Sequence, residues 1–155
     1  MEDDADFERL SKLPDVDGFI TISRLLLPQT FQSFQELREV AAKLNADMLL
    51  VYTFDTTFHE KDGSAALSLI TLGLSPTQTM IVRVAASALL LDTRTGYIHA
   101  ALEANEKREV TTNIWKSQKE ADRARQDAER TAFKALISEF EKNWSRIVER
   151  GKKGA

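Results

Sequence analysis

The sequence predicts an α/β fold, an α+β sandwich in which a mixed sheet of about four or five strands is packed by a short helix and a long C-terminal helix. Three patterns lead to this prediction. Apolar residues alternate along residues 80–90 and again along 98–104, with turn-forming residues between them, which is typical of a long β-hairpin. Apolar residues also recur at helical spacing along 34–44 and along 118–148. Strands and helices with one apolar face bury those faces against each other.

Length and composition favour one globular domain. The 155 residues, 43% of them hydrophobic and 29% charged, suit a single core that needs neither a metal nor a disulfide. We expect this domain to span residues 16–149, between a flexible acidic N-terminus at 1–15 and a basic tail at 150–155. The net charge of −3 argues against a nucleic-acid partner, because phosphate binding needs clustered Lys and Arg. The absence of cysteine excludes a disulfide framework and a thiolate metal site.

The first predicted elements are a strand and a short helix. Residues 19–27 are rich in β-branched and apolar side chains and predict a strand. A helix is predicted over 34–44, where Ser33 and Glu36 have the spacing of a capping box. In such a box each side chain bonds the other residue's backbone N–H. The expected end of this helix is Asn45.

A second strand is predicted over residues 47–58. Its apolar face carries Met48, Leu50, Tyr52, Phe54 and Phe58. Leu49 and Val51 on the other face indicate that the start of the strand is buried on both sides. The far end of that second face is polar and should be solvated, at Thr53, Asp55 and Thr57. Residues 59–63 predict a polar loop.

The hairpin over 79–107 is the clearest pattern in the chain. Its two alternating segments, 80–90 and 98–104, are separated by Asp92-Thr93-Arg94-Thr95-Gly96. An Asp side chain can bond the backbone two residues on, and Gly accepts a positive φ at little cost. This chemistry predicts a loop of four or five residues that joins two antiparallel strands.

The long C-terminal helix is predicted over 118–148, and it opens with a second capping box, Ser117 and Glu120. Small residues line its first half, at Ala121, Ala124, Ala128, Ala132 and Ala135. Larger residues line its second half, at Phe133, Leu136, Ile137, Phe140, Trp144 and Ile147. We expect the first half to lie close to a sheet and the second half to need a deeper groove or a partner.

No catalytic, metal-binding or phosphate-binding motif is recognisable, so we predict no cofactor and no enzymatic activity. His59 and His99 are the candidates for acid–base chemistry or metal binding, but no second His or Glu stands at helical ligand spacing. We interpret both as surface imidazoles. An alternative hypothesis is a small hydrolase-type enzyme in which they meet carboxylates such as Asp55, Glu60 and Asp62 in one pocket.

Residues 64–77 form the most unusual stretch, because they carry no charge and fit neither strict alternation nor a helical stripe. They predict either a buried strand or short core helix, or a hydrophobic loop that covers a partner's surface or touches the membrane edge. The candidate contacts of such a loop are Leu67, Leu69, Ile70, Leu72 and Leu74. Phe140 and Trp144 are a second candidate interface, through which a structural subunit would oligomerise.

Three segments carry a resemblance to a known group of proteins. Residues 38–52, REVAAKLNADMLLVY, look like a helix-to-strand step in which Ala-Asp precedes an apolar strand. Residues 86–98, ASALLLDTRTGYI, look like a hairpin with an Asp-x-x-Thr-Gly turn, and the alanine-lined last helix matches a closing element. The chain thereby resembles the bacterial envelope lipoproteins that include the curli secretion channel subunit, the amino-terminal domain of the Tol translocation protein and the activators of penicillin-binding proteins.

The resemblance covers most of residues 19–148. It implies an α/β sandwich, a non-catalytic role and a periplasmic location, lipid-anchored at the outer membrane in the full-length form. The sequence shows no export signal and no Cys for lipidation, so a cytoplasmic location is expected if no signal precedes Met1. We therefore predict a binding or assembly domain of an envelope lipoprotein. Its expected partner is another protein or a second copy, and any membrane contact runs through a lipid anchor outside this chain.

Overall fold

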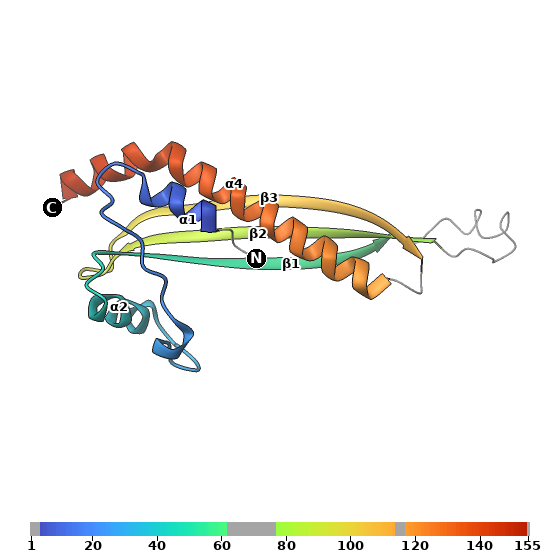
Figure 1. Ribbon diagram of the computed structural model, residues 1–155, viewed down its shortest axis with the longest axis horizontal. Coiled ribbons are helices and arrows are strands. Elements are labelled where there is room, and N and C mark those ends of the chain that lie inside the picture. Colours follow the sequence, from blue (N-terminus) through green and yellow to red (C-terminus); the bar gives the residue numbers. More distant parts are fainter. Residues whose placement is uncertain (1–3, 62–76, 114–116, 155) are drawn as a thin grey trace, which may run out of the picture. The chain divides into compact units, whose positions relative to one another are not determined.

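The computed structural model describes residues 4–61, 77–113 and 117–154 and has the predicted α+β fold (Figure 1). Its elements, in chain order, are α1 (Asp4–Ser11), η1 (Arg24–Leu26), α2 (Phe34–Lys43), β1 (Met48–Lys61), β2 (Thr77–Asp92), β3 (Ile98–Asn113) and α4 (Ser117–Gly154). The described strands form one antiparallel sheet in the order β1-β2-β3. The sheet therefore has three strands rather than the predicted four or five, and it is antiparallel rather than mixed.

The chain divides into two compact units. Unit 1 comprises Met1–Glu2, Phe54–Ala86 and Ala104–Ala135. Unit 2 comprises Asp3–Thr53, Ser87–Glu103 and Leu136–Ala155. The boundary falls inside each strand and inside α4, so each unit has its own part of the sheet and its own part of that helix.

In unit 1, α4 crosses one face of the sheet. Thr56 on β1 donates a hydrogen bond from its hydroxyl to the Glu129 carboxylate on α4, at 3.1 Å. Arg108 on β3 forms an ion pair with Asp127 on the same helix, also at 3.1 Å. Because the helix contacts both outer strands, it lies across the central strand, β2.

Small side chains allow this close approach. Ala128 and Ala132 are fully buried and Ala124 is 4% exposed, as the sequence predicts. Ala135 was included in the predicted buried stripe but is exposed. The buried side of α4 continues through Phe133 and the larger residues after it. Ala135 does not lie on that side and therefore faces solvent.

The central strand shows the predicted alternation along both units. Its buried alternate residues are Met80, Val82, Val84 and Ala86 in unit 1 and Ala88 and Leu90 in unit 2. β2 has a neighbour on each side, so the hairpin with β3 and the pairing with β1 both depend on it. The prediction of a hairpin formed by residues 79–107 is confirmed.

In unit 2, a further helix packs against the start of β1. Leu37 and Ala41 of α2 form a buried cluster with Leu49, and Val51 packs against that cluster. Leu50, on the opposite face of the strand, is half-buried. The start of β1 is thus covered on both faces, as predicted.

The N-terminus of α2 differs in detail from the predicted capping box. Ser33 is the N-cap residue, but its side chain makes no capping hydrogen bond. The Glu36 carboxylate instead accepts a hydrogen bond from the backbone N–H of Gln32, at 3.0 Å. The Glu36 side chain therefore bonds a backbone N–H at the helix start, as in a capping box. That N–H belongs to Gln32, one residue before the predicted Ser33.

Helix α2 ends at Lys43, with Leu44 as its C-cap, and the chain turns away at the predicted stop residue, Asn45, which has a φ of 55°. The Asn45 N–H donates to the Ala42 carbonyl at 3.0 Å, and the Ala46 N–H donates to the Ala41 carbonyl at 3.1 Å. These two bonds form a Schellman motif, in which a left-handed residue turns the chain away from the helix axis.

The β2–β3 turn is built around Asp92. Its carboxylate accepts hydrogen bonds from the Thr95 N–H at 2.6 Å and the Thr95 hydroxyl at 2.8 Å. The Gly96 N–H donates to the Asp92 carbonyl and the Asp92 N–H donates to the Tyr97 carbonyl, both at 2.9 Å. With Gly96 at a φ of 76°, this is a bulged turn that requires glycine. Bonding by the Thr95 backbone N–H is the main cause that lowers the pKa of Asp92.

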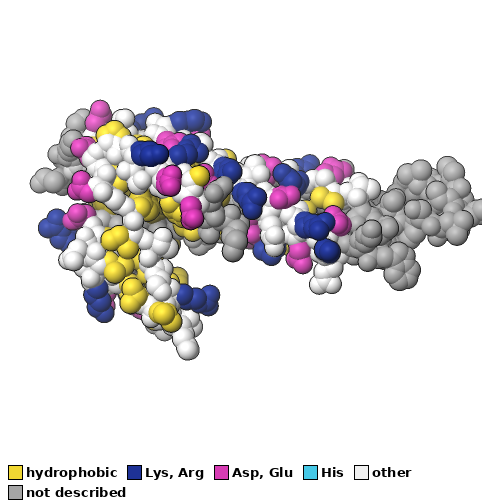
Figure 2. All heavy atoms as spheres, viewed as in Figure 1, with side chains coloured by type: hydrophobic (Ala, Val, Ile, Leu, Met, Phe, Trp, Pro, Cys, Tyr) yellow, Lys and Arg dark blue, Asp and Glu magenta, His cyan; other side chains and the backbone are white. Residues whose placement is uncertain are grey.

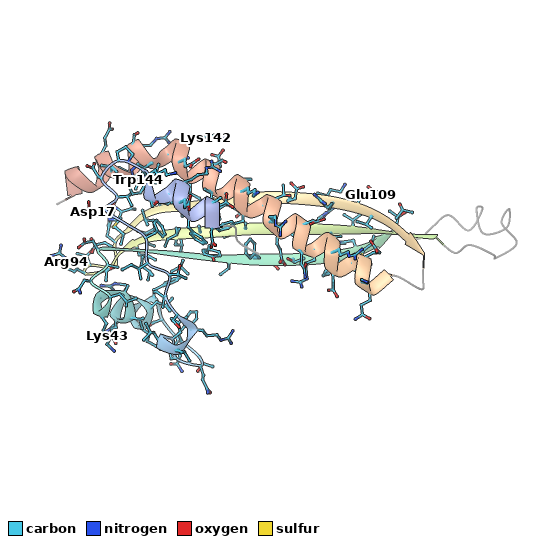
Figure 3. All side chains as sticks on the ribbon, viewed as in Figure 1. Asp17, Lys43, Arg94, Glu109, Lys142 and Trp144 are labelled. Atoms are coloured by element: carbon cyan, nitrogen blue, oxygen red, sulfur yellow. The ribbon has the colours of Figure 1, made fainter. Side chains whose placement is uncertain are left out.

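Helix α2 also binds this turn. Arg38 donates from Nε to the Thr93 carbonyl at 2.9 Å, and a second guanidinium nitrogen donates to the Arg94 carbonyl. A Cβ on Gly96 would lie 2.6 Å from the Arg38 guanidinium, which is a second reason for glycine at that position. Figure 3 shows Arg94 at the end of the hairpin.

The N-terminus was predicted to be flexible over residues 1–15, but residues 4–11 form α1. In unit 2, Leu10 of this helix is fully buried, and the Arg9 Nε donates to the Glu141 carboxylate of α4 at 3.0 Å. The segment is acidic in composition, but one side of the helix is apolar. Only the contact with a neighbouring helix shows that this side is buried.

The predicted strand at residues 19–27 is wrong. Only the short helix η1 forms there, with the Ser23 hydroxyl accepting from the Leu25 N–H at 3.3 Å, and no residue of the segment is buried. A strand must pair its backbone with a neighbour, and in the described sheet this segment pairs with none of the three strands. Consecutive apolar residues at 25–27 also break the alternation that one buried face requires.

Two predicted boundaries also need correction. β1 continues to Lys61, so residues 59–61 of the predicted polar loop belong to a strand. α4 continues to Gly154, so the predicted basic tail at 150–155 is helical through that residue. Extended strand pairing and helix propagation override the polar composition of both ends.

We expect Ala128→Leu to destabilise the protein by about 1–3 kcal/mol, because the added volume has no space between α4 and the sheet. Ala135→Leu on the same helix is the matched control and should change the free energy of unfolding by less than about 0.5 kcal/mol, since position 135 is exposed. Urea denaturation followed by circular dichroism measures both. Equal effects of the two substitutions would show that α4 does not approach the sheet through Ala128.

The Asp92 turn predicts a pH-dependent contribution to stability. Because the folded state lowers the Asp92 pKa, its stabilising effect is complete above the unfolded pKa of about 3.9 and is lost as the pH falls through the folded pKa. Denaturation curves should therefore show a stability difference between the parent and Asp92→Asn that is larger at pH 7 than at pH 2.5. Asp55→Asn controls for loss of one carboxylate. A stability difference that is larger at low pH would contradict the conclusion that these hydrogen bonds stabilise the charged form of Asp92.

Candidate functional site

The most conspicuous surface of unit 2 is a group of exposed apolar residues between α1 and the start of α2. Their exposed fractions are 40% for Phe19, 61% for Ile20, 95% for Leu25, 50% for Leu26, 53% for Phe31 and 44% for Phe34. Figure 2 shows hydrophobic side chains gathered over the region of η1 and α2. We call these six residues the N-terminal apolar surface.

The local sequence explains why these side chains face outward. Ile22 and Leu27 pack against the Leu37 cluster and hold the segment to α2. Phe19 also contacts the ring of Phe7 on α1, with centroids 6.2 Å apart. Leu25 and Leu26 lie between these two anchors in the turn of η1, none of whose residues is buried.

This exposure is more than the ordinary scatter of apolar residues on a protein surface. Elsewhere in the described part of the chain, three other large apolar residues are exposed, Phe58, Tyr97 and Ile98. Six such residues within one sixteen-residue span, 19–34, form a group of the kind that marks an interaction site. The connection from α1 to α2 is also long for one with little regular structure, which is typical of a functional loop.

A second surface lies on the face of unit 1 that is lined by polar strand residues. Asp55 and Thr57 of β1 are exposed, as the sequence predicts. Together with Arg83, Asn105 and Lys107 they line a depression of about 330 Å³. Charges of both signs lie there on exposed side chains, so the depression has no single electrostatic preference and we assign it no ligand.

A third surface is a groove in unit 2 between β3 and α4, with a volume of about 170 Å³. It is lined by His99, Ala100, Ala101 and Leu102 from β3 and by Asn143, Arg146, Ile147 and Arg150 from α4. The His99 ring meets the Tyr97 ring edge-on, with centroids 4.9 Å apart. A Cβ on Gly151 would lie 3.4 Å from the same imidazole, so α4 passes close to His99.

The two histidines do not come together in one unit. His59 lies exposed near the end of β1 in unit 1, and His99 lies half-buried at the start of β3 in unit 2. Of the carboxylates considered with them, Asp55 is in unit 1 and Asp62 lies outside the described residues. Within residues 4–61, 77–113 and 117–154, no group of three or more His, Asp or Glu side chains is placed to hold a metal ion.

The predicted interface residues have different outcomes. Leu67, Leu69, Ile70, Leu72 and Leu74 lie outside the described residues. Phe140 and Trp144 are buried in unit 2, at 4% and 8% exposure, with their rings 5.4 Å apart. The Trp144 indole N–H donates to the Pro14 carbonyl at 2.8 Å, and Figure 3 shows Trp144 on α4. The structure therefore places both side chains in the core of unit 2, with Pro14 of the N-terminal segment beside Trp144.

The N-terminal apolar surface was missed because residues 19–27, which include four of its six members, were assigned to a strand. The available signal was the lack of strict alternation at Leu25, Leu26 and Leu27. Phe31 and Phe34, which stand among Gln, Thr and Ser residues, were a second signal. Apolar residues without a period are candidates for a surface rather than for a buried strand.

Comparison with known proteins finds no matching protein-family model and no matching curated protein. Among the helices of the described residues, none combines the length and the apolar run that crossing a membrane requires. The function therefore has to be argued from the surfaces themselves.

Proposed function

We propose that this chain is a non-catalytic binding or assembly domain of a bacterial cell-envelope lipoprotein, and that the N-terminal apolar surface is where a partner protein binds. The observation that carries the proposal is the exposure of six large apolar side chains in one segment, with Leu25 95% exposed. Surfaces of this composition are favourable to bury and unfavourable to leave in water.

The energies involved are adequate for specific association. Burying one exposed Leu or Phe side chain fully contributes about 1.5–3 kcal/mol, and a few such anchors carry most of the energy of a typical interface. Leu25 and Leu26 project from a short helical turn, which suits insertion into an apolar pocket of the partner. The exposed polar residues beside them, Arg24 and Gln29, would form the polar rim that such interfaces have.

The envelope assignment is supported by a separate argument, the resemblance to envelope lipoproteins. The helix-to-strand step of that resemblance falls on α2 and β1, and its hairpin falls on β2 and β3. The alanine-lined closing helix corresponds to α4. The order of elements is therefore compatible with the resemblance, which in turn favours a non-catalytic role and an anchored location.

The binding surface predicts a crosslink that depends on its apolar residues. We expect a photo-crosslinking amino acid in place of Leu25 to give a discrete adduct in cells, and Leu26→Asp with Phe31→Asp to reduce that adduct at least tenfold. Introducing Asp into an apolar contact leaves an unpaired buried charge, which is strongly unfavourable. The adduct mass distinguishes a second copy from a different partner protein.

The matched control places the same two charges on polar residues of the same segment, Gln29→Asp with Gln32→Asp, and should retain the adduct. A crosslinking residue at Lys43, the last residue of α2, tests for non-specific capture. All variants should unfold at the same urea concentration as the parent, since the changed side chains are exposed. If the Leu26 and Phe31 substitutions leave the adduct unchanged, this surface is not the interface.

The envelope assignment makes its own prediction. In cells that express the complete gene, the protein should sediment with the membrane fraction, remain there in 1 M salt and be released by a mild detergent. A lipid anchor holds a protein by apolar contacts that salt does not weaken, whereas charge-mediated attachment is lost at high ionic strength. Recovery in the cytosolic fraction would contradict the lipoprotein assignment and leave the binding surface to be tested separately.

A further inference from the structure

The outer edge of β3 is available for backbone pairing. Within the described residues, β3 has β2 as its only neighbouring strand. The Tyr97 carbonyl points toward β2, because it accepts from the Asp92 N–H at 2.9 Å. Backbone groups in an antiparallel pair alternate in direction, so Ala100 and Leu102 direct their N–H and C=O groups away from β2. An edge of this kind is a template for an added strand.

Helix α4 places positive charge beside this edge. The four helix residues that line the groove, Asn143, Arg146, Ile147 and Arg150, are spaced so that they lie on one face of the helix. The complete lining contains two Arg, one His and one Asn and no carboxylate. The groove therefore prefers a negatively charged occupant.

The two arginines have no ion-pair partner among the described residues, in contrast to Lys142, which pairs with Glu139 at 2.8 Å. Arg146 and Arg150 are four residues apart on α4, where like charges destabilise each other. The helix dipole favours cations in the last turn but not two turns earlier, where Arg146 stands. An anionic ligand between helix and strand would offset this repulsion.

We propose that the β3 edge and α4 of unit 2 bind an extended acidic peptide segment as an added strand, with Arg146 and Arg150 pairing with its carboxylates. Ala100 and Ala101 leave room for the incoming backbone, and Leu102 and Ile147 supply an apolar contact. The volume of about 170 Å³ is room for several water molecules, which an acidic side chain would displace. A free backbone edge beside the charges favours a peptide over an isolated phosphate, which cannot use it.

The probe for this site is a fluorescein-labelled eight-residue peptide of alternating Val and Glu, titrated with the full chain and followed by fluorescence anisotropy. We expect saturable binding that weakens with added salt, and no binding of the matching peptide of alternating Val and Lys. Arg146→Gln with Arg150→Gln should weaken binding at least tenfold. Lys142→Gln, on the same helix but outside the groove, should leave it within twofold.

Two further arms test the added strand itself. A Val-Glu peptide that is N-methylated at alternate residues keeps its charges but loses backbone donors, and it should bind at least fivefold more weakly. Ala100→Pro should have a similar effect, because it removes an outward N–H and leaves the bonds to β2 in place. If the Ala100→Pro variant does not fold, the Arg146 and Arg150 substitutions still test the proposal, because they lie on a helix face at the groove.

Three results would overturn the proposal. Equal binding of the methylated and unmethylated peptides would reduce the site to a simple anion site. Competition by millimolar inorganic phosphate, or equal binding to vesicles of anionic phospholipid, would identify a phosphate group as the ligand instead of a peptide. Loss of peptide binding in Leu26→Asp with Phe31→Asp, but not in the arginine variants, would place the peptide on the N-terminal apolar surface.

Discussion

The packing of α4 on the sheet is the interaction on which the rest of the structure depends. In unit 1 this helix contacts β1 through Glu129 and β3 through Asp127, so it bridges both strands that flank β2. Alanines at 128 and 132 bring it close enough for the alternating side chains of β2 to be buried. A three-stranded sheet has few strand pairings of its own, and a covering helix supplies the apolar burial that makes it stable.

Unit 2 has additional helices around its own part of the sheet, and these helices create the surfaces of interest. Helix α2 packs on Leu49 and binds the hairpin turn through Arg38, while α1 is joined to α4 by the contact of Arg9 with Glu141. The chain between α1 and α2 must then connect two separate helices. Its anchors, Ile22 and Leu27, leave neighbouring apolar residues in solvent. The apolar surface is thus a consequence of how the connection is held.

The two proposed surfaces differ in physical character and serve different kinds of partner. The N-terminal apolar surface gains free energy from removing hydrocarbon from water and gives little directional information. The groove between β3 and α4 offers backbone groups and two arginines, which select an extended acidic chain by geometry and charge. Two surfaces of different character would suit the assembly role proposed above, because each could hold a different partner.

The sequence by itself determined the elements whose signals are local: the hairpin with its Asp92 and Gly96 turn, helix α2 with the turn at Asn45 that follows it, and the long helix α4. It did not determine the number of strands, because residues 19–27 have strand-like composition and only a neighbouring strand could have made them one. The Trp144 indole likewise finds its hydrogen-bond partner, the Pro14 carbonyl, in an N-terminal segment that is distant in the sequence. Local periodicity fixes which side of an element is apolar, whereas the tertiary structure alone decides whether anything covers that side.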